Sequence, residues 1–136
     1  MPADGLPAAP FDPAMTRRAD ILIVEDDEYL RLTLRHTLRL AGFDTREARS
    51  GMEALAMLDR GRPDAVVLDI ILPGIDGLAV YDEIRAHSGT RDLPVIIITG
   101  SSLPLEQLSA ACVLRKPFAP DDLVRAVEEC LKSGER

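Results

Sequence analysis

Short, continuous apolar runs alternate along the chain with stretches in which apolar residues recur every three or four positions. Four such runs cover residues 21–24, 65–68, 95–98 and 113–114. The first three contain no polar residue, which is typical of strands covered on both faces. Strands that alternate with amphipathic helices predict βαβ units around one parallel sheet.

Helical spacing and turn residues divide the chain into a regular series of elements. Residues 28–41 carry Leu30 and Leu34 at helical spacing, and Gly42 ends that helix. Residues 101–110 predict a short helix at best. The predicted strands cover residues 20–25, 43–48, 65–69, 95–99 and 111–115, and further helices begin near residues 50, 78 and 120.

The second predicted strand is polar, with Asp44, Arg46 and Glu47, and this composition favours the edge of the sheet. Right-handed crossovers then favour the strand order 2-1-3-4-5, counted along the chain. In that order the first and third strands are neighbours. We therefore expect Asp26 and Asp69 to lie side by side.

Polar residues follow four of the five predicted strands. In an open parallel sheet these positions meet at the carboxyl edge, where α/β proteins bind their ligands. A carboxylate cluster, a hydroxyl and an ammonium group together favour a divalent metal and a phosphoryl group. The residues are Glu25, Asp26 and Asp27 after the first strand, Asp69 after the third, Thr99 after the fourth and Lys116 after the fifth.

Crowded carboxylates repel one another, so a fold that keeps them needs a compensating cation, and Mg²⁺ prefers such oxygen ligands. A solvated acidic loop that binds nothing is the alternative. Asp69 is either a ligand alone or a nucleophile that attacks phosphorus. Thr99 and Lys116 favour the second role, because a hydroxyl and a cation can hold two phosphoryl oxygens. Taken singly, they are typical of a strand-end threonine and a surface lysine.

Composition narrows the class of protein. With 136 residues the chain is long enough for one domain, and its net charge of -7 argues against a nucleic-acid-binding surface. No apolar run approaches the roughly 20 residues of a membrane span. Cys112 and Cys130 lack CxxC spacing and indicate small thiols in a reducing cytosol, so we expect a cytoplasmic protein.

The N-terminal segment differs from the rest because it holds four of the ten prolines and no periodic pattern. We interpret residues 1–19 as a disordered leader, with Met15 as an alternative natural start. The remaining chain divides into a domain at residues 20–133 and a tail at residues 134–136.

Over residues 20–133 the chain resembles the receiver domains of bacterial two-component response regulators. The resemblance rests on ILIVEDD at residues 21–27, LDIILPGIDG at 68–77, ITG at 98–100 and RKPF at 115–118. It implies a flavodoxin-like, doubly wound α/β fold with a five-stranded parallel sheet. It also implies that Lys116-Pro117 is a cis bond.

The resemblance assigns roles to the polar strand ends. Asp69 would accept the phosphoryl group, and Mg²⁺ would be bound directly by Asp26 and through water by Glu25. Asp27 is given no ligand role. The remaining roles are the backbone carbonyl of Ile71 as a metal ligand, Thr99 as the switch hydroxyl, Gly100 as its small neighbour and Lys116 as the phosphoryl counter-ion.

Two features depart from this family. Only 17 positions separate Thr99 from Lys116, which predicts a shortened or irregular fourth helix. Val113 occupies a position where the family usually has Tyr or Phe, which turns inward during switching. Both departures fall on the surface that commonly carries output and dimerisation. We therefore expect a non-standard output face.

The resemblance implies a signalling receiver that takes a phosphoryl group from a sensor histidine kinase or a histidine phosphotransfer protein. Without an attached output domain it would bind an unknown output protein or pass the phosphoryl group on, as a monomer or a phosphorylation-dependent dimer. It would turn over no separate substrate, and we expect no nucleic-acid or membrane partner. An Mg²⁺-dependent phosphatase is one alternative, but Ile71 stands where its general acid is needed. An interaction module that is never phosphorylated is the other.

The helix at residues 28–41 carries Arg31, Arg35 and Arg39 on one face. In the family this helix is the usual docking surface for a kinase, so a basic stripe there would set partner choice by charge. Ordinary solvation is the alternative. We interpret His36, on the same helix, as a surface residue rather than a phosphodonor.

Overall fold

The computed structural model describes residues 18–72, 74–100 and 112–134. Most of the predicted leader and the predicted short fourth helix lie outside the described residues. The division of the chain into leader, domain and tail therefore stays a prediction.

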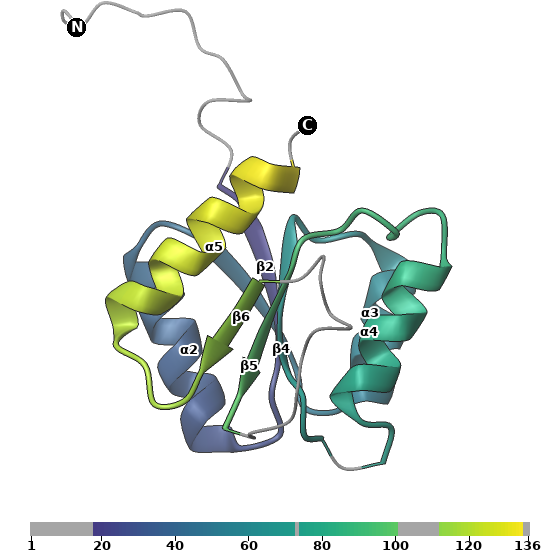
Figure 1. Ribbon diagram of the computed structural model, residues 1–136, viewed down its shortest axis with the longest axis horizontal. Coiled ribbons are helices and arrows are strands. Elements are labelled where there is room, and N and C mark those ends of the chain that lie inside the picture. The colour runs from purple at the N-terminus through teal and green to yellow at the C-terminus, as the bar shows by residue number, and fades with distance from the viewer. Residues whose placement is uncertain (1–17, 73, 101–111, 135–136) are drawn as a thin grey trace, which may run out of the picture.

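Five parallel strands form one sheet in the order β3-β2-β4-β5-β6 (Figure 1). Counted along the chain, this is the predicted order 2-1-3-4-5, which is confirmed. Edge strand β3 is partly exposed, as its polar composition predicts, whereas β4 and β5 are buried along their whole length. The strands are β2 (Asp20–Val24), β3 (Asp44–Ala48), β4 (Ala65–Asp69), β5 (Val95–Thr99) and β6 (Cys112–Arg115).

Helices cover both faces of the sheet, so the predicted doubly wound, flavodoxin-like arrangement is confirmed. Figure 1 shows α2 and α5 on one face and α3 and α4 on the other. Because successive strand residues point to opposite faces, Ile23 packs with the α2–α5 core and Val24 with the α3–α4 core. The helices are α2 (Glu28–Leu40), α3 (Gly51–Arg60), α4 (Gly77–Ala86) and α5 (Pro120–Gly134).

Both cysteines are free thiols, as predicted. Cys130 is buried between α5 and the sheet, with its Sγ 3.9 Å from the backbone oxygen of Val95. Burial raises the pKa of the Cys130 thiol to about 12. The neutral thiol therefore behaves here as a small core side chain. Within the described residues, no helix is both long and apolar enough to cross a membrane.

The first residue of α4, Gly77, brings that helix directly over the end of β4. The Gly77 N–H donates to the Ile70 oxygen at 2.9 Å, and Asp76 caps the helix by accepting from the Ala79 N–H at 2.9 Å. A Cβ atom at position 77 would overlap the backbone of Asp69 and Ile70. The absence of a side chain at Gly77 therefore lets α4 approach the strand end that carries Asp69.

Replacing Gly77 with alanine is expected to lower the free energy of unfolding by about 2–3 kcal/mol, because backbone atoms must move to admit the methyl group. Urea denaturation measures the change. Gly61→Ala is the matched control, since a Cβ there meets nothing within 4 Å. Equal stability of the two variants would contradict the close approach of α4 to β4.

Candidate functional site

Three carboxylates meet at the carboxyl edge of the sheet, as the strand order predicts. Glu25 and Asp26 directly follow β2, and Asp69 ends β4. In the parallel register Val24 pairs with Leu68, so the residues after them lie side by side. One carboxylate oxygen from each of the three residues lies within 4.8 Å of the others.

Burial separates this cluster from an ordinary acidic loop. Glu25 and Asp69 are only 1% and 5% exposed, whereas Asp26 is exposed to solvent. Two buried carboxylates at this distance repel each other and have lost most of their hydration. Their burial therefore argues against a solvated loop that binds nothing.

Glu25 has an unusual environment. Its Oε2 accepts a hydrogen bond from the Asp27 N–H at 3.1 Å, whereas its buried Oε1 accepts none from the described residues. Burial raises the pKa of the Glu25 carboxyl to about 8; the Asp27 N–H opposes this rise, and the neighbouring Asp69 adds to it. An unsatisfied buried carboxylate oxygen beside two further carboxylates fits a divalent cation that prefers oxygen ligands.

Lys116 brings a positive charge to the cluster. Its Nζ lies 3.4 Å from Asp69 Oδ2 and 3.9 Å from Glu25 Oε1. Its backbone N–H donates to the backbone carbonyl oxygen of Thr99 at 2.8 Å, and this bond fixes Lys116 beside the end of β5. The Lys116–Pro117 bond is cis, as the resemblance implies. The ammonium group is thus the counter-ion of the buried carboxylates in the described structure.

The remaining predicted site residues lie around Asp69. Thr99 is fully buried at the end of β5, one position beyond Ile98, which pairs with Asp69. Ile71 donates its N–H to Asp69 Oδ1 at 3.1 Å and leaves its side chain 63% exposed. Gly100 is next to the Lys116 side chain, because a Cβ atom added at Gly100 would lie 3.8 Å from Lys116 Cδ. The structure therefore brings the predicted strand-end residues to one edge.

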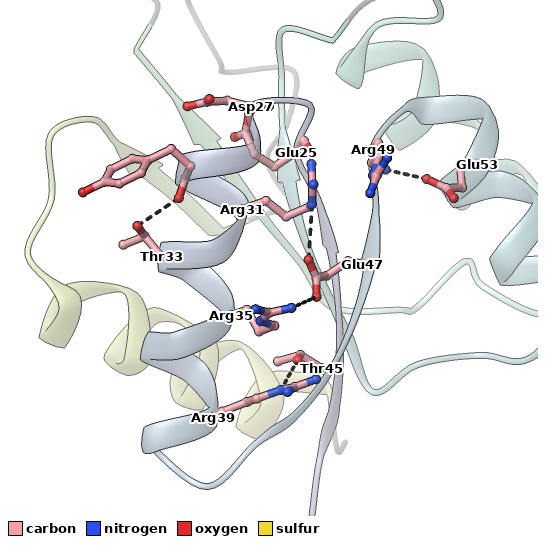
Figure 2. A network of polar contacts seen from close by, with 11 residues as sticks. Glu25, Asp27, Arg31, Thr33, Arg35, Arg39, Thr45, Glu47, Arg49 and Glu53 are labelled. Carbon is pink, nitrogen blue, oxygen red and sulfur yellow. Dashed lines mark hydrogen bonds and ion pairs between the residues drawn. The ribbon is translucent and has the colours of Figure 1, made fainter.

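The arginine stripe of α2 is only partly open to a partner, since Arg31 is buried whereas Arg39 is exposed. Arg31 is buried and donates to Glu47, Arg35 donates to Glu47 at 3.0 Å, and Arg39 donates to Thr45 at 2.8 Å (Figure 2). The stripe faces edge strand β3. The hypothesis that it offers an open basic face is therefore wrong for Arg31, and the other two guanidinium groups also bind within the chain.

His36 is exposed on α2, as predicted. Sequence reasoning missed one residue near the site. This residue is Arg31, which donates to the backbone oxygen of Glu25 at 3.0 Å. The sequence carries no signal for this contact, because an arginine six positions after Glu25 is typical of a solvated helix face.

A family model of the response regulator receiver domain matches residues 21–128. The chain belongs to this family. As a receiver domain of a two-component system, it falls in a class that is not generally made up of enzymes acting on a separate substrate. Receiver domains typically use Mg²⁺ in an acidic pocket, and Glu25, Asp26 and Asp69 form such a group here.

Among curated relatives, the receiver domain is 37% identical over 117 residues to Response regulator MprA of Mycobacterium leprae (strain TN). The match covers 82% of this chain and 50% of that relative. The chain thus spans about half the length of the curated relatives it matches.

Solved structures agree with this assignment. A putative response regulator from Chloroflexus aurantiacus J-10-fl has a TM-score of 0.80 at 36% identity, over 85% of this chain and 99% of that one. The signal receiver domain of a histidine kinase from Syntrophus aciditrophicus has a TM-score of 0.79 at 31% identity, over 87% and 93%. The chemotaxis protein CheY4 of Vibrio cholerae has a TM-score of 0.77 at 27% identity, over 84% and 99%.

Proposed function

We propose that this receiver domain accepts a phosphoryl group on Asp69 from a histidine kinase or a histidine phosphotransfer protein in the cytoplasm. The observation that carries the proposal is the Lys116 ammonium 3.4 Å from Asp69 Oδ2, inside a cluster of three carboxylates. A carboxylate fixed beside a cation is a competent nucleophile toward phosphorus, because phosphoryl transfer depends mainly on positioning and charge neutralisation.

In this proposal an oxygen of Asp69 attacks the phosphorus atom of phosphohistidine. The new P–O bond forms as the P–N bond breaks, and the imidazole leaves with the electron pair. The Ile71 N–H, which donates to Asp69 Oδ1 at 3.1 Å, orients the carboxylate and leaves Oδ2 on the Lys116 side. Lys116 and the Thr99 hydroxyl then hold phosphoryl oxygens. Later attack by water returns Asp69 to its free form.

Glu25, Asp26, Asp69 and the backbone carbonyl of Ile71 are the groups that would hold Mg²⁺. The buried, unsatisfied Oε1 of Glu25 supports this assignment. When bound, the ion supplies positive charge against the carboxylates and the phosphoryl oxygens.

The α2 surface beside the site supports docking of a phosphodonor. Tyr29 is 80% exposed on α2, and a hollow of about 270 Å³ lies between this helix and the start of α5. Leu30 and Phe118 contribute to its lining, and so does Lys116. An apolar hollow that reaches the proposed counter-ion suits a helix that presents phosphohistidine.

Incubation of the full chain with acetyl phosphate and Mg²⁺, followed by intact-mass analysis, tests the proposal. We expect one added phosphoryl group, mapped to Asp69 by peptide analysis and absent when EDTA replaces Mg²⁺. An unmodified chain under these conditions would sink the proposal and favour an interaction module. The phosphatase alternative gains no support, because the aliphatic side chain of Ile71 has no proton to give.

We also propose a non-standard output face. Val113 lies on β6 with its side chain 39% exposed, and a valine cannot undergo the inward aromatic rotation that the family resemblance implies. The output partner therefore reads a change that does not pass through an aromatic ring at this position. Comparison of the phosphorylated and free chains by NMR is expected to show shifts at Thr99 with little change at Val113. Equal shifts at both residues would argue for ordinary coupling.

A further inference from the structure

Arg31 is a buried cation next to the acidic cluster, although it does not end a strand. It lies in α2 and is only 4% exposed. Its Nη1 donates to the backbone oxygen of Glu25 at 3.0 Å, and its Nε donates to Glu47 Oε1 at 3.2 Å (Figure 2). A buried guanidinium group needs such an anionic partner, and Glu47 on the edge strand provides it.

These contacts close a ring around Glu25. The Glu25 backbone N–H donates to the Ala48 carbonyl oxygen at 3.1 Å, and the Glu25 backbone carbonyl oxygen accepts from the Arg31 guanidinium group. Arg31 in turn binds Glu47, the residue before Ala48. The backbone groups on both sides of the Glu25 side chain are therefore fixed to the end of β3.

The ring also fixes the residue that follows. The Glu25 carbonyl and the Asp26 N–H belong to one planar peptide unit, so a bond to that carbonyl sets the orientation of the whole plane. Asp26 is exposed, which leaves its carboxylate less confined by packing than that of Glu25. The Arg31 backbone N–H also donates to the backbone carbonyl oxygen of Asp27 at 2.9 Å, at the start of α2.

We propose that Arg31 is a positioning residue for the acidic pair Glu25 and Asp26, acting through the Glu25 carbonyl rather than by contact with a ligand. The inference rests on the proposed function, since it concerns the metal that this pair would hold. Second-sphere partners that orient metal ligands typically change affinity by about 10- to 100-fold when they are removed.

Arg35 provides a matched comparison on the same helix face. It forms an ion pair with Glu47 Oε2 at 3.0 Å, as Arg31 does with Oε1, but the bond to the Glu25 carbonyl comes from Arg31. If Arg31 served only to attach α2 to β3, loss of either arginine would weaken stability and leave metal binding alone. A positioning role predicts a different effect for Arg31.

The experiment measures Mn²⁺ affinity of the full chain by electron paramagnetic resonance, because Mn²⁺ shares the oxygen-ligand preference of Mg²⁺. We expect Arg31→Met to weaken the affinity by about tenfold and Arg35→Met to leave it close to the wild-type value. Arg31→Lys keeps a charge but lacks the fork that reaches both acceptors, so it should restore part of the affinity. Urea denaturation of each variant reports stability separately.

A second readout is the Mg²⁺ dependence of labelling by acetyl phosphate. Arg31→Lys should need more Mg²⁺ for half-maximal labelling and reach a rate near that of the wild type at saturation. Equal Mn²⁺ affinity in wild type, Arg31→Met and Arg35→Met would overturn the inference, and wild-type affinity in Arg31→Lys would overturn it where Arg31→Met does not fold. A wild-type chain that binds Mn²⁺ but takes no phosphoryl group would refute the proposed function and leave the positioning role to be judged on affinity.

Discussion

Asp69→Asn is expected to abolish phosphoryl uptake and to change the stability of the fold little. A neutral amide is too poor a nucleophile to attack phosphorus, so acetyl phosphate should add no mass to this variant. The fold itself should tolerate the change. The asparagine oxygen can still accept the Ile71 N–H, which now donates to Asp69 Oδ1 at 3.1 Å.

The small effect on stability follows from the charges around Asp69. At 4.8 Å and an effective dielectric near 20, repulsion between the buried carboxylates of Asp69 and Glu25 costs about 3–4 kcal/mol when both are ionised, whereas solvent screens the exposed Asp26. The attraction of Asp69 to Lys116 at 3.4 Å returns about 5 kcal/mol on the same scale. The two contributions nearly cancel, so the free energy of unfolding of Asp69→Asn is expected to stay within about 1–2 kcal/mol of the wild-type value.

Asp59→Asn is the control for this prediction, because it removes an exposed carboxylate on α3 away from the cluster. This variant should be labelled like the wild type and unfold at the same urea concentration. Labelling of Asp69→Asn at the wild-type level would exclude Asp69 as the phosphoacceptor.

The sheet and its polar edge could be predicted from the sequence because the positions of the apolar runs determine both. The apolar runs at residues 21–24, 65–68 and 95–98 are buried on both sides, and the polar residue that follows each run marks the carboxyl end of a strand. Parallel strands place all those ends at one edge. Asp69, Thr99 and Lys116 could therefore be assigned to a common site before any contact was known.

The role of Arg31 could not be found in the same way. Within a helix, an arginine is typical of a solvated face, and Arg35 and Arg39 follow Arg31 at four-residue spacing as such a face would. Its burial depends on Glu47, which lies 16 positions later on an edge strand. Pairing across that distance is a tertiary property. Likewise, the sequence places an acidic residue, Glu25, at the end of the strand. Only the packing around it leaves its Oε1 buried and without a hydrogen bond.

Glu25 makes the stability of the metal-free fold depend on pH. Its carboxyl has a pKa raised from 4.5 to about 8, chiefly by burial. Between these values the folded state binds a proton that the unfolded state has released, so stability falls as the pH rises. A pKa difference of this size corresponds to about 3–5 kcal/mol, at about 1.4 kcal/mol for each unit.

Glu25→Gln isolates this contribution, because the amide resembles the protonated carboxyl and does not titrate. The difference in free energy of unfolding between Glu25→Gln and wild type is expected to be small near pH 5 and to grow steadily toward pH 8. Urea denaturation in EDTA across this range measures it. Groups common to both proteins, such as His36 and His87, cancel in the difference.

Mg²⁺ should reverse the loss, because it binds the ionised carboxylate and stabilises the folded state by mass action. The stabilisation by Mg²⁺ is therefore expected to be larger at pH 8 than at pH 5 in the wild type, and to be much weaker in Glu25→Gln. Potassium chloride at matched ionic strength controls for screening. If the two proteins showed the same pH slope, burial of Glu25 would not control its ionisation; if potassium acted as well as Mg²⁺, the acidic cluster would be no specific metal site.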